Sequence, residues 1–563
     1  MIKLSGAEII IQLLEKRGIE IIAGIPGGAN LPLYNALYKS KIKHVLVRHE
    51  QAGGFIAQGM ARTSGKTAVC FATSGPGATN VITAIADAKL DSIPVVCITG
   101  QVSTALIGTD AFQEIDTYGL TLPITKHNYL VSKASDLLHI IPEAFRIAES
   151  GRPGPVVVDV PKDVQNQIVE FEAWPSMFFE PQSYEVHDEH IMKMAEMIHA
   201  AQRPILYIGG GVVYGNACEL VARIAQINSI PITSTLMGLG AIDPNNELFI
   251  GMLGMHGAPY TNYLISQTDL LIALGVRFDD RATGNLKQFC PNANVIHVDI
   301  DKSEINKLKT SHLGLISDVK PILEKLLPLI EQNQRIEWIE NLRNLRKSFP
   351  LSLPNHEDVF HPFNLIRTVA NLVPANTIIT TDVGQHQMWV AQIYPFSSPR
   401  SLLTSGGLGT MGFGLPAAIG AALAQPDKTV ICFSGDGSIL MNIQELATLA
   451  DLRLNVKIIL MNNKHLGLVR QQQELFYNQN FIASKFITDP DFAAIGRAFG
   501  IKSIDLQYAK DPIGYLNRAL SDKSPWLINV PIQSEHNVLP MVPPGAPNHE
   551  MIVQTPKPMR MVY

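Results

Sequence analysis

The chain has 563 residues, which leaves room for about three domains, and 46% of them are hydrophobic, so large cores can form. Its net charge of −5, without clusters of Lys or Arg, argues against a nucleic-acid partner. The N-terminus lacks a signal-peptide or transit-peptide pattern, and no apolar run is long enough and free of charge to span a membrane. Five scattered cysteines without a CxxC spacing indicate free thiols in a reducing compartment, so we expect a cytoplasmic protein with no membrane partner.

Residues 1–163 alternate helix and strand patterns. Val156 to Val160 forms the last strand, and earlier apolar runs end in polar or glycine-rich phrases at Gly24 to Ala29, Arg48 to Glu50, Thr73 to Gly77 and Gly100-Gln101. Strands that end in such loops, with helices between them, predict a doubly wound parallel sheet.

A second domain is expected over residues 187–335, between linkers at 164–186 and 336–360 that lose periodicity. Its strand at Pro204 to Ile208 runs into Gly209-Gly210-Gly211. A glycine triplet after a strand is a weak dinucleotide signal, and it marks the start of a helix equally well.

The third domain is expected over residues 361–545, followed by a tail at 546–563. In it, a buried strand ends at Gly435-Asp436-Gly437, a helix is predicted over Ile439 to Leu452, and a second strand ends at Asn462-Asn463. This βαβ unit brings Asp436 and Asn463 to one sheet edge. A carboxylate and an amide oxygen beside glycines suit Mg²⁺ holding a diphosphate, although each dipeptide alone is an ordinary turn signal.

The two phrases, separated by 24 residues (438–461), resemble the thiamine diphosphate motif of the thiamine-dependent enzyme superfamily. That superfamily activates its cofactor with a glutamate that follows a strand in another domain, and Glu50 stands in such a place. In isolation Glu50 would be read as a solvated loop residue. The resemblance implies that its carboxyl bonds the pyrimidine ring nitrogen and promotes the imino tautomer.

The phrases Ser150 to Pro155, Val160 to Asp163, Leu253 to Gly257 and Gly275 to Arg281 extend the resemblance over essentially the whole chain, to the acetohydroxyacid synthases (acetolactate synthases). The family implies an α/β fold of three doubly wound parallel-sheet domains. They are a pyrimidine-binding domain, a central FAD-binding domain and a diphosphate-binding domain.

The resemblance also implies roles for individual residues. Magnesium would be held by the side chains of Asp436 and Asn463 and by the carbonyl of His465, with Met411 as a wedge that bends the cofactor. Further cofactor contacts are implied at Ser92, Gln113, Gln385, His386, Gly409, Thr410, Gly437, Ser438, Gly467 and Leu468. FAD contacts are implied at Arg152, Gly210, Thr235, Leu236, Leu253, Gly254, Met255, His256, Gly275, Arg277, Asp299, Ile300, Asp318 and Val319.

Around the reacting carbon, Gln113 and the backbone near Gly28 would supply polar contacts. Arg281 would clamp the carboxylate of the second keto acid, although a surface salt bridge is its plain alternative. Lys162 and Lys126 are placed in a substrate channel, with solvated lysines as the alternative.

The chain departs from the family where Gln472 takes the place of an acceptor-pocket tryptophan, as in some bacterial isozymes. We predict a weaker preference for 2-ketobutyrate over pyruvate, since the two differ by one methylene. Leu468 replaces a usual methionine, Ser103 stands where proline is common and Ala105 where arginine is frequent, so the channel shape and herbicide response are open.

The implied reaction joins two pyruvates to 2-acetolactate, or pyruvate and 2-ketobutyrate to 2-aceto-2-hydroxybutyrate, in branched-chain amino-acid synthesis. Because Glu50 and the diphosphate motif lie on different domains, a homodimer is the minimum active unit, with a homotetramer and a small regulatory subunit as further family features. Alternatives are an FAD-dependent pyruvate oxidase and a noncatalytic thiamine diphosphate-binding regulatory protein. A nicotinamide dehydrogenase, suggested by the glycine triplet, has least support.

Overall fold

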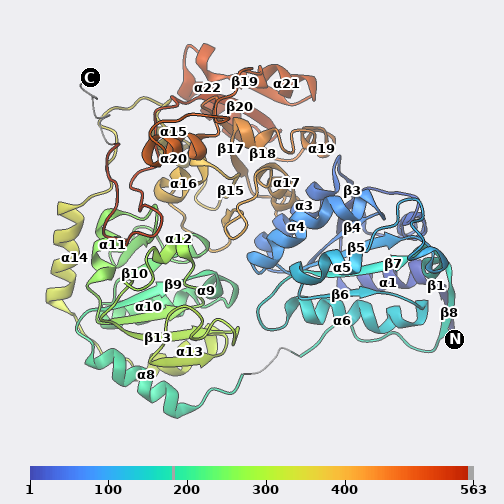
Figure 1. Ribbon diagram of the computed structural model, residues 1–563, viewed down its shortest axis with the longest axis horizontal. Helices are drawn as coiled ribbons and strands as arrows, with labels where there is room; N and C mark the ends of the chain where they lie inside the picture. The colour runs from blue at the N-terminus through green and yellow to red at the C-terminus, as the bar shows by residue number, and fades with distance from the viewer. Residues whose placement is uncertain (181–183, 556–563) are drawn as a thin grey trace.

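The computed structural model describes residues 1–180 and 184–555. It contains three six-stranded parallel sheets, each covered by helices (Figure 1). Their strand orders are β3-β2-β4-β5-β7-β6, β11-β10-β9-β12-β13-β14 and β16-β15-β17-β18-β20-β19. We call the three parts the N-terminal, central and C-terminal units, and they confirm the predicted α/β fold class.

The N-terminal unit contains the first of these sheets and a small antiparallel pair. Its strands are β1 (Ile2–Ser5), β2 (Ile21–Gly24), β3 (Lys43–Leu46), β4 (Ala68–Ala72), β5 (Val95–Gln101), β6 (His127–Leu130), β7 (Val156–Pro161) and β8 (Ile168–Phe171). Its helices are α1 (Gly6–Arg17), α2 (Leu31–Leu37), α3 (Glu50–Ser64), α4 (Pro76–Leu90), α5 (Thr117–Thr121), α6 (Leu137–Glu149) and α7 (Lys162–Asn166).

The predicted linker at 164–186 is wrong in its first part. Helix α7 extends into it as far as Asn166, and β8 pairs antiparallel with β1. The apolar partner of β8 lies at the opposite end of the unit's sequence, so local periodicity did not reveal it. Residues 181–183 of that linker lie outside the described residues.

The central unit is built around the second sheet. Its strands are β9 (Pro204–Ile208), β10 (Ile232–Ser234), β11 (Phe249–Met252), β12 (Leu270–Leu274), β13 (Asn294–Asp299) and β14 (Leu313–Ile316). Its helices are α8 (Asp188–Ala200), α9 (Gly210–Tyr214), α10 (Cys218–Asn228), α11 (Pro259–Ser266), α12 (Asp280–Thr283), α13 (Val319–Leu326) and α14 (Ile336–Ser348).

The predicted linker at 336–360 is also wrong in its first part, because α14 is a helix of the central unit. Trp338 is buried in an apolar cluster with Leu342, and its indole Nε1 donates to the carbonyl of Pro204 at 3.0 Å. Few of the residues of α14 are buried, so the charged sequence concealed its packing.

The C-terminal unit carries the third sheet. Its strands are β15 (Ile378–Thr381), β16 (Leu402–Leu403), β17 (Val430–Gly435), β18 (Val456–Asn462), β19 (Lys502–Asp505) and β20 (Trp526–Pro531). Its helices are α15 (Pro362–Leu372), α16 (Gln385–Ile393), α17 (Gly414–Ala424), α18 (Asp436–Ile439), α19 (Glu445–Leu452), α20 (Gly467–Phe476), α21 (Phe492–Ala498) and α22 (Pro512–Ser521).

Single 3₁₀ turns occur in all three units. They are η1 (Thr104–Leu106), η2 (Leu122–Ile124), η3 (Ala134–Asp136), η4 (Leu236–Gly238), η5 (Leu327–Leu329) and η6 (Leu506–Tyr508).

The helix predicted over 439–452 is two helices, α18 and α19, separated by an irregular turn. Asn442 occupies this turn and donates from its side chain to the carbonyl of Gly412 at 2.8 Å. The break therefore lets the chain between the two strands support the neighbouring loop instead of only covering the sheet.

The N-terminal and C-terminal units meet where α3 crosses α17 (Figure 1). A Cβ built on Gly59 would lie 2.2 Å from the carbonyl oxygen of Ala417, and one on Gly420 would lie 2.1 Å from that of Ile56. The small residues of both helices thus permit backbone contact. One apolar cluster runs continuously through both units, so their cores are joined.

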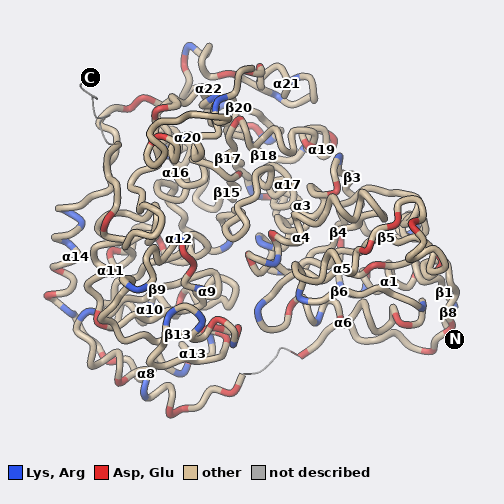
Figure 2. The backbone as a smooth tube through the Cα atoms, in the orientation of Figure 1, with Lys and Arg blue, Asp and Glu red and all other residues tan. Residues whose placement is uncertain are grey.

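Acidic and basic residues are interspersed over all three units (Figure 2). This distribution agrees with the absence of basic clusters in the sequence. No helix in the described ranges has the length and apolar character needed to cross a bilayer.

Candidate active site

Asp436 and Asn463 lie at neighbouring strand ends of the C-terminal sheet, as predicted. Asp436 follows β17 and begins α18, whereas Asn463 directly follows β18, which pairs in parallel with β17. The side-chain Nδ2 of Asn463 donates to Oε1 of Gln385 at 3.0 Å. Gly467 closes the cluster, since a Cβ there would meet that Oε1 at 2.0 Å.

The environment of Asp436 suits a cation. The residue is 4% exposed, and burial raises the pKa of its carboxyl to about 7, against the opposing effect of backbone N–H donors. A divalent ion would offset this desolvation. The described residues contain no group of three or more His, Cys, Asp or Glu that could hold a metal alone. The candidate set of one carboxylate, one amide and one carbonyl therefore fits Mg²⁺ only with further oxygen ligands, such as phosphate and water.

His386 is a buried imidazole beside these loops. Burial lowers its pKa to about 3, so the ring is neutral at physiological pH, and its Nε2 has no hydrogen-bond partner among the described residues. A Cβ on Gly435 would meet Nδ1 of His386 at 2.9 Å, which places the ring against the strand end that precedes Asp436. An unpaired buried ring nitrogen at this position suits a bound ligand.

The loop that carries Met411 is held by hydrogen bonds at several points. Asp382 Oδ1 accepts from the backbone N–H of Gly412 at 2.7 Å, and Ser405 Oγ accepts from that of Thr410 at 2.8 Å. Gly409 has a φ of 71°, and a Cβ there would meet no atom within 4 Å. The loop is thus fixed at both ends while its glycine turn faces open space.

Glu50 and Gln113 come together in the N-terminal unit. Glu50 begins α3, and its Oε2 accepts from Asn80 Nδ2 at 3.0 Å. A Cβ on Gly77 would lie 3.4 Å from Glu50 Oε1, and one on Gly75 would lie 2.9 Å from the Cα of Gln113. Both predicted residues therefore border the turn between β4 and α4, whereas the Asp436 loops lie in the C-terminal unit. Gly28 is exposed, with nothing within 4 Å of a Cβ built on it.

One cavity of about 1080 Å³ opens where the three units meet. This volume is at the upper end for small-molecule sites, and it suits an extended ligand. Its lining includes 18 of the predicted residues: Ser92, Arg152, Gly210, Thr235, Leu236, Leu253, Met255, His256, Gly275, Arg277, Arg281, Asp299, Ile300, Asp318, Val319, Gly409, Leu468 and Gln472. Gly254, predicted as a flavin contact, is absent from this lining, and its N–H donates to Asn262 at 2.9 Å.

The glycines at the ends of β9 and β12 shape the central part of this cavity. A Cβ on Gly211 would lie 2.6 Å from the Cα of Gly275, and one on Gly209 would lie 2.2 Å from the carbonyl oxygen of Gly275. Gly275 itself has a φ of 58°. These glycines let the ends of two adjacent strands approach each other. Glycines of dinucleotide-binding motifs play the same packing role.

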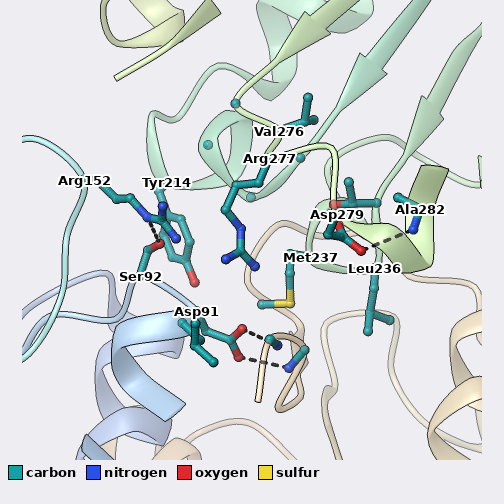
Figure 3. Close-up of a pocket in the computed structure, with 18 of the residues that line it drawn as sticks. Asp91, Ser92, Arg152, Tyr214, Leu236, Met237, Val276, Arg277, Asp279 and Ala282 are labelled. Carbon is teal, nitrogen blue, oxygen red and sulfur yellow. Dashed lines mark hydrogen bonds between the residues drawn. The ribbon is translucent and has the colours of Figure 1, made fainter. Parts of the chain in front are cut away.

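Charged groups lie at the end of the cavity nearest the N-terminal unit. Arg152 Nε donates to Ser92 Oγ at 2.8 Å (Figure 3), and its Nη1 donates to Glu304 at 2.9 Å. Asp299 lies at the end of β13, and burial raises the pKa of its carboxyl to about 6. A basic group and an acidic group thus both reach the same cavity, as the chemistry of phosphate and ribose recognition requires.

Two further contributors to the site escaped sequence analysis. Asp91 Oδ1 accepts from the N–H of Gly407 at 2.7 Å and Asp91 Oδ2 from that of Gly406 at 3.0 Å (Figure 3). Met541, from the proline-rich segment near the C-terminus, also lines the cavity. Neither carries a local signal, because the groups they meet are far away in the sequence.

The two lysines predicted for the substrate channel do not line the cavity. Lys126 donates to the carbonyls of Ile147 and Ser150 at the end of α6, and burial lowers the pKa of its ammonium to about 8. Its channel role also stays a prediction. Lys162 begins α7 and is exposed, so its role stays a prediction.

Three family models match the chain. They are the thiamine pyrophosphate enzyme N-terminal TPP binding domain over residues 4–120, the central domain over residues 191–326 and the C-terminal TPP binding domain over residues 382–530.

Relatives match over nearly the full length. The chain is 55% identical to the acetolactate synthase isozyme 1 large subunit of Escherichia coli (strain K12), with 98% of each chain covered. It is 45% identical to the isozyme 2 large subunit of the same organism, covering 98% of this chain and 99% of the relative. It is 43% identical to the chloroplastic acetolactate synthase of Arabidopsis thaliana, covering 98% and 84%. The chain therefore belongs to the thiamine pyrophosphate enzymes and, among them, to the acetolactate synthase large subunit family.

Proposed function

We propose that this chain is the catalytic subunit of an acetolactate synthase. It decarboxylates pyruvate and joins the remaining two-carbon unit to a second pyruvate, giving 2-acetolactate, or to 2-ketobutyrate, giving 2-aceto-2-hydroxybutyrate. The observation that carries this proposal is the shared cavity, which Arg281 reaches from the central unit and Gln472 from the C-terminal unit. Gly409 and Leu468 extend its lining to the loops beside Asp436 and Asn463.

Thiamine diphosphate, when bound, supplies the carbon nucleophile and takes up the electrons released by decarboxylation. Glu50 would hold a proton at the pyrimidine ring. Asp436, Asn463 and the carbonyl of His465 would hold Mg²⁺ on the diphosphate, and the neutral His386 would contact the cofactor through its unpaired Nε2. Met411, on the tethered loop, would support the bend of the cofactor.

The second keto acid would be held by its carboxylate at Arg281. The guanidinium is 67% exposed, and its acidic neighbour Asp280 is 3.8 Å away and itself exposed, so that ion pair is weak. A planar guanidinium can bind both carboxylate oxygens at once. Gln472 in place of a tryptophan leaves more room for the acceptor, which supports a weaker preference for 2-ketobutyrate.

FAD is proposed for the part of the cavity bordered by Gly210, Gly275, Arg152 and Asp299. Because the condensation transfers no net electrons, its role there would be structural. The close approach of Gly211 to Gly275 and the size of the cavity support this assignment.

A second copy of the chain would complete the site. The described hydrogen bond of the Glu50 carboxylate stays within its own unit, where Asn80 is the donor. Both units expose large apolar side chains, including Phe112 (89%) in the N-terminal unit and Ile482 (76%) and Ile487 (102%) in the C-terminal unit, which supports contact with a second copy. The name "large subunit" borne by the relatives supports a small regulatory partner as well.

Product analysis of the purified chain tests the function. The protein is incubated with pyruvate, Mg²⁺ and thiamine diphosphate, with FAD added or omitted, while acetolactate, acetate and flavin colour are followed together. We expect acetolactate that depends on FAD without net flavin reduction. Bleached flavin with acetate or acetyl phosphate would instead establish a pyruvate oxidase.

A further inference from the structure

The segment from Asn537 to Asn548 joins the two sides of the proposed acceptor site. At one end, Gln471 on α20 accepts from the N–H of Val538 at 2.7 Å and donates to its carbonyl at 3.0 Å. At the other end, Asn548 Nδ2 donates to the carbonyl of Ala282 on α12 at 2.9 Å. Helix α20 carries Gln472 and α12 carries Arg281, so this segment sets the spacing between the two residues.

Met541 lies in the middle of the segment and lines the cavity. Its Sδ accepts from Gln471 Nε2 at 3.3 Å, while the next residue, Val542, donates its N–H to the carbonyl of Met255 at 2.8 Å. Met255 in turn donates its N–H to the carbonyl of Arg281 at 2.7 Å, and its Sδ lies 4.0 Å from Nη1 of Arg281. Met541 is 2% exposed, so these neighbours hold its side chain in place.

The chemistry of the two acceptors makes this position decisive. Pyruvate and 2-ketobutyrate share a carboxylate and a keto group and differ by one methylene. If Arg281 takes the carboxylate, the alkyl group extends away from the guanidinium toward the remaining walls of the cavity. A thioether held in place is an apolar wall of fixed extent, so its size sets the room left for the alkyl group, whereas Gln472 offers a polar wall.

We infer that Met541 is the apolar wall of the acceptor pocket and that it determines, together with Gln472, the selection between the two keto acids. This inference rests on the proposed function. It assigns specificity to a residue of the C-terminal segment that lies 69 positions from Gln472 (541 − 472) in the sequence.

The test is a competition between acceptors. Wild type, Met541→Ala and Met541→Phe are each given pyruvate and 2-ketobutyrate together, and the ratio of acetohydroxybutyrate to acetolactate is measured. This ratio does not depend on the fraction of active enzyme, so partial misfolding leaves it unchanged. The control is Met237→Ala, because Met237 lines the same cavity from the central unit beside Gly406.

We expect Met541→Ala to raise the ratio by about threefold or more, because it leaves room for the extra methylene of 2-ketobutyrate. Met541→Phe should lower the ratio, because it takes that room away. A methylene in a fitted pocket changes selectivity by about 10- to 200-fold. Met237→Ala should leave the ratio within about twofold of wild type, because Met237 lies beside Gly406 and outside the segment that joins α20 to α12. An unchanged ratio in both Met541 variants, or the same change in the Met237 control, overturns the inference. A wild-type protein that forms neither product overturns the proposed function itself, which is a distinguishable failure.

Discussion

Replacing Arg62 with methionine tests the buried ion cluster that joins the N-terminal and C-terminal units. Arg62 Nη2 lies 2.8 Å from Asp91 and 3.3 Å from Asp87, and the three side chains are at most 4% exposed. Its Nη1 donates to the carbonyl of Thr404 at 3.0 Å, and the guanidinium lies 5.0 Å from the ring centre of Phe413. The two aspartates in turn accept hydrogen bonds from the loop that leads to Met411.

Methionine preserves most of the apolar volume but leaves two adjacent carboxyls buried without a cation. Removal of one partner from a buried ion pair costs about 3–5 kcal/mol. Loss of the contact with Phe413 contributes about 1 kcal/mol of that total. We therefore expect the free energy of unfolding to fall by about 4 kcal/mol at pH 8.

The loss should depend on pH with a definite sign. Burial and the neighbouring Asp91 charge hold the pKa of Asp87 above its usual range, and Arg62 opposes this effect. Without Arg62 the folded-state pKa of Asp87 rises further above the unfolded value of about 4. Between these two pKa values the folded protein binds more protons than the unfolded chain, so its stability falls as pH rises. The destabilisation is therefore smallest near pH 5 and grows as pH rises through the raised pKa.

Urea unfolding followed by circular dichroism at pH 5 and pH 8 measures both effects. Arg48→Met is a matched control, because Arg48 pairs with Asp451 at 2.6 Å across the same two units, with side chains that are 31% and 65% exposed. Its loss should be under about 1 kcal/mol at either pH. Equal losses for the two variants, or a larger Arg62→Met loss at pH 5 than at pH 8, would refute the reasoning.

Three further changes have defined outcomes. Gly59→Ala places a Cβ 2.2 Å from a carbonyl oxygen of α17 and should lower the free energy of unfolding by about 1–3 kcal/mol. Gly53→Ala in the same helix, where the nearest atom is 3.6 Å away, should leave that free energy unchanged or raise it by up to about 1 kcal/mol. Similar thermal melting of the two variants would contradict this. Burial lowers the pKa of His361 to about 4, so the folded protein binds fewer protons than the unfolded chain between about pH 4 and 6.5, and stability falls as pH drops through that window. His361→Asn keeps a favourable N-cap for α15 and should flatten the decline in the urea midpoint between pH 7 and 4.5. A decline as steep as that of the wild type would rule this prediction out. Gly211→Ala would place a Cβ 2.6 Å from the Cα of Gly275 and should reduce flavin absorbance per chain after gel filtration. Gly496→Ala, whose Cβ would lie 2.1 Å from Ser503 Oγ in the C-terminal unit, should retain flavin. Equal flavin content in the two variants would argue against the proposed FAD site.

Local sequence predicted the elements that carry the site because their signals lie within a few residues. The β-branched run before Gly435 and the run before Asn462 form β17 and β18, so both polar phrases were placed at adjacent strand ends. The family resemblance then identified 18 of the residues that line the cavity.

Local sequence was least informative where tertiary contacts supply the stabilisation. Helix α14 is held by Trp338 against the central sheet, and β8 is paired with β1, so neither has a strong periodic signal of its own. The carbonyl partners of Lys126 at the end of α6 likewise had no local signal in the sequence.

The sequence by itself determined the three parallel sheets, the glycine-rich strand ends and the residue types available for cofactor chemistry, since each depends on neighbours along the chain. Only the tertiary structure decided that Arg62, Asp87 and Asp91 hold the Met411 loop, and that Met541 reaches the cavity beside Gln472. The first set of contacts joins the N-terminal and C-terminal units, and the second joins residues that lie far apart in the sequence of one unit. Their free energy comes from burial and charge pairing in three dimensions, which leave no periodic trace along the chain.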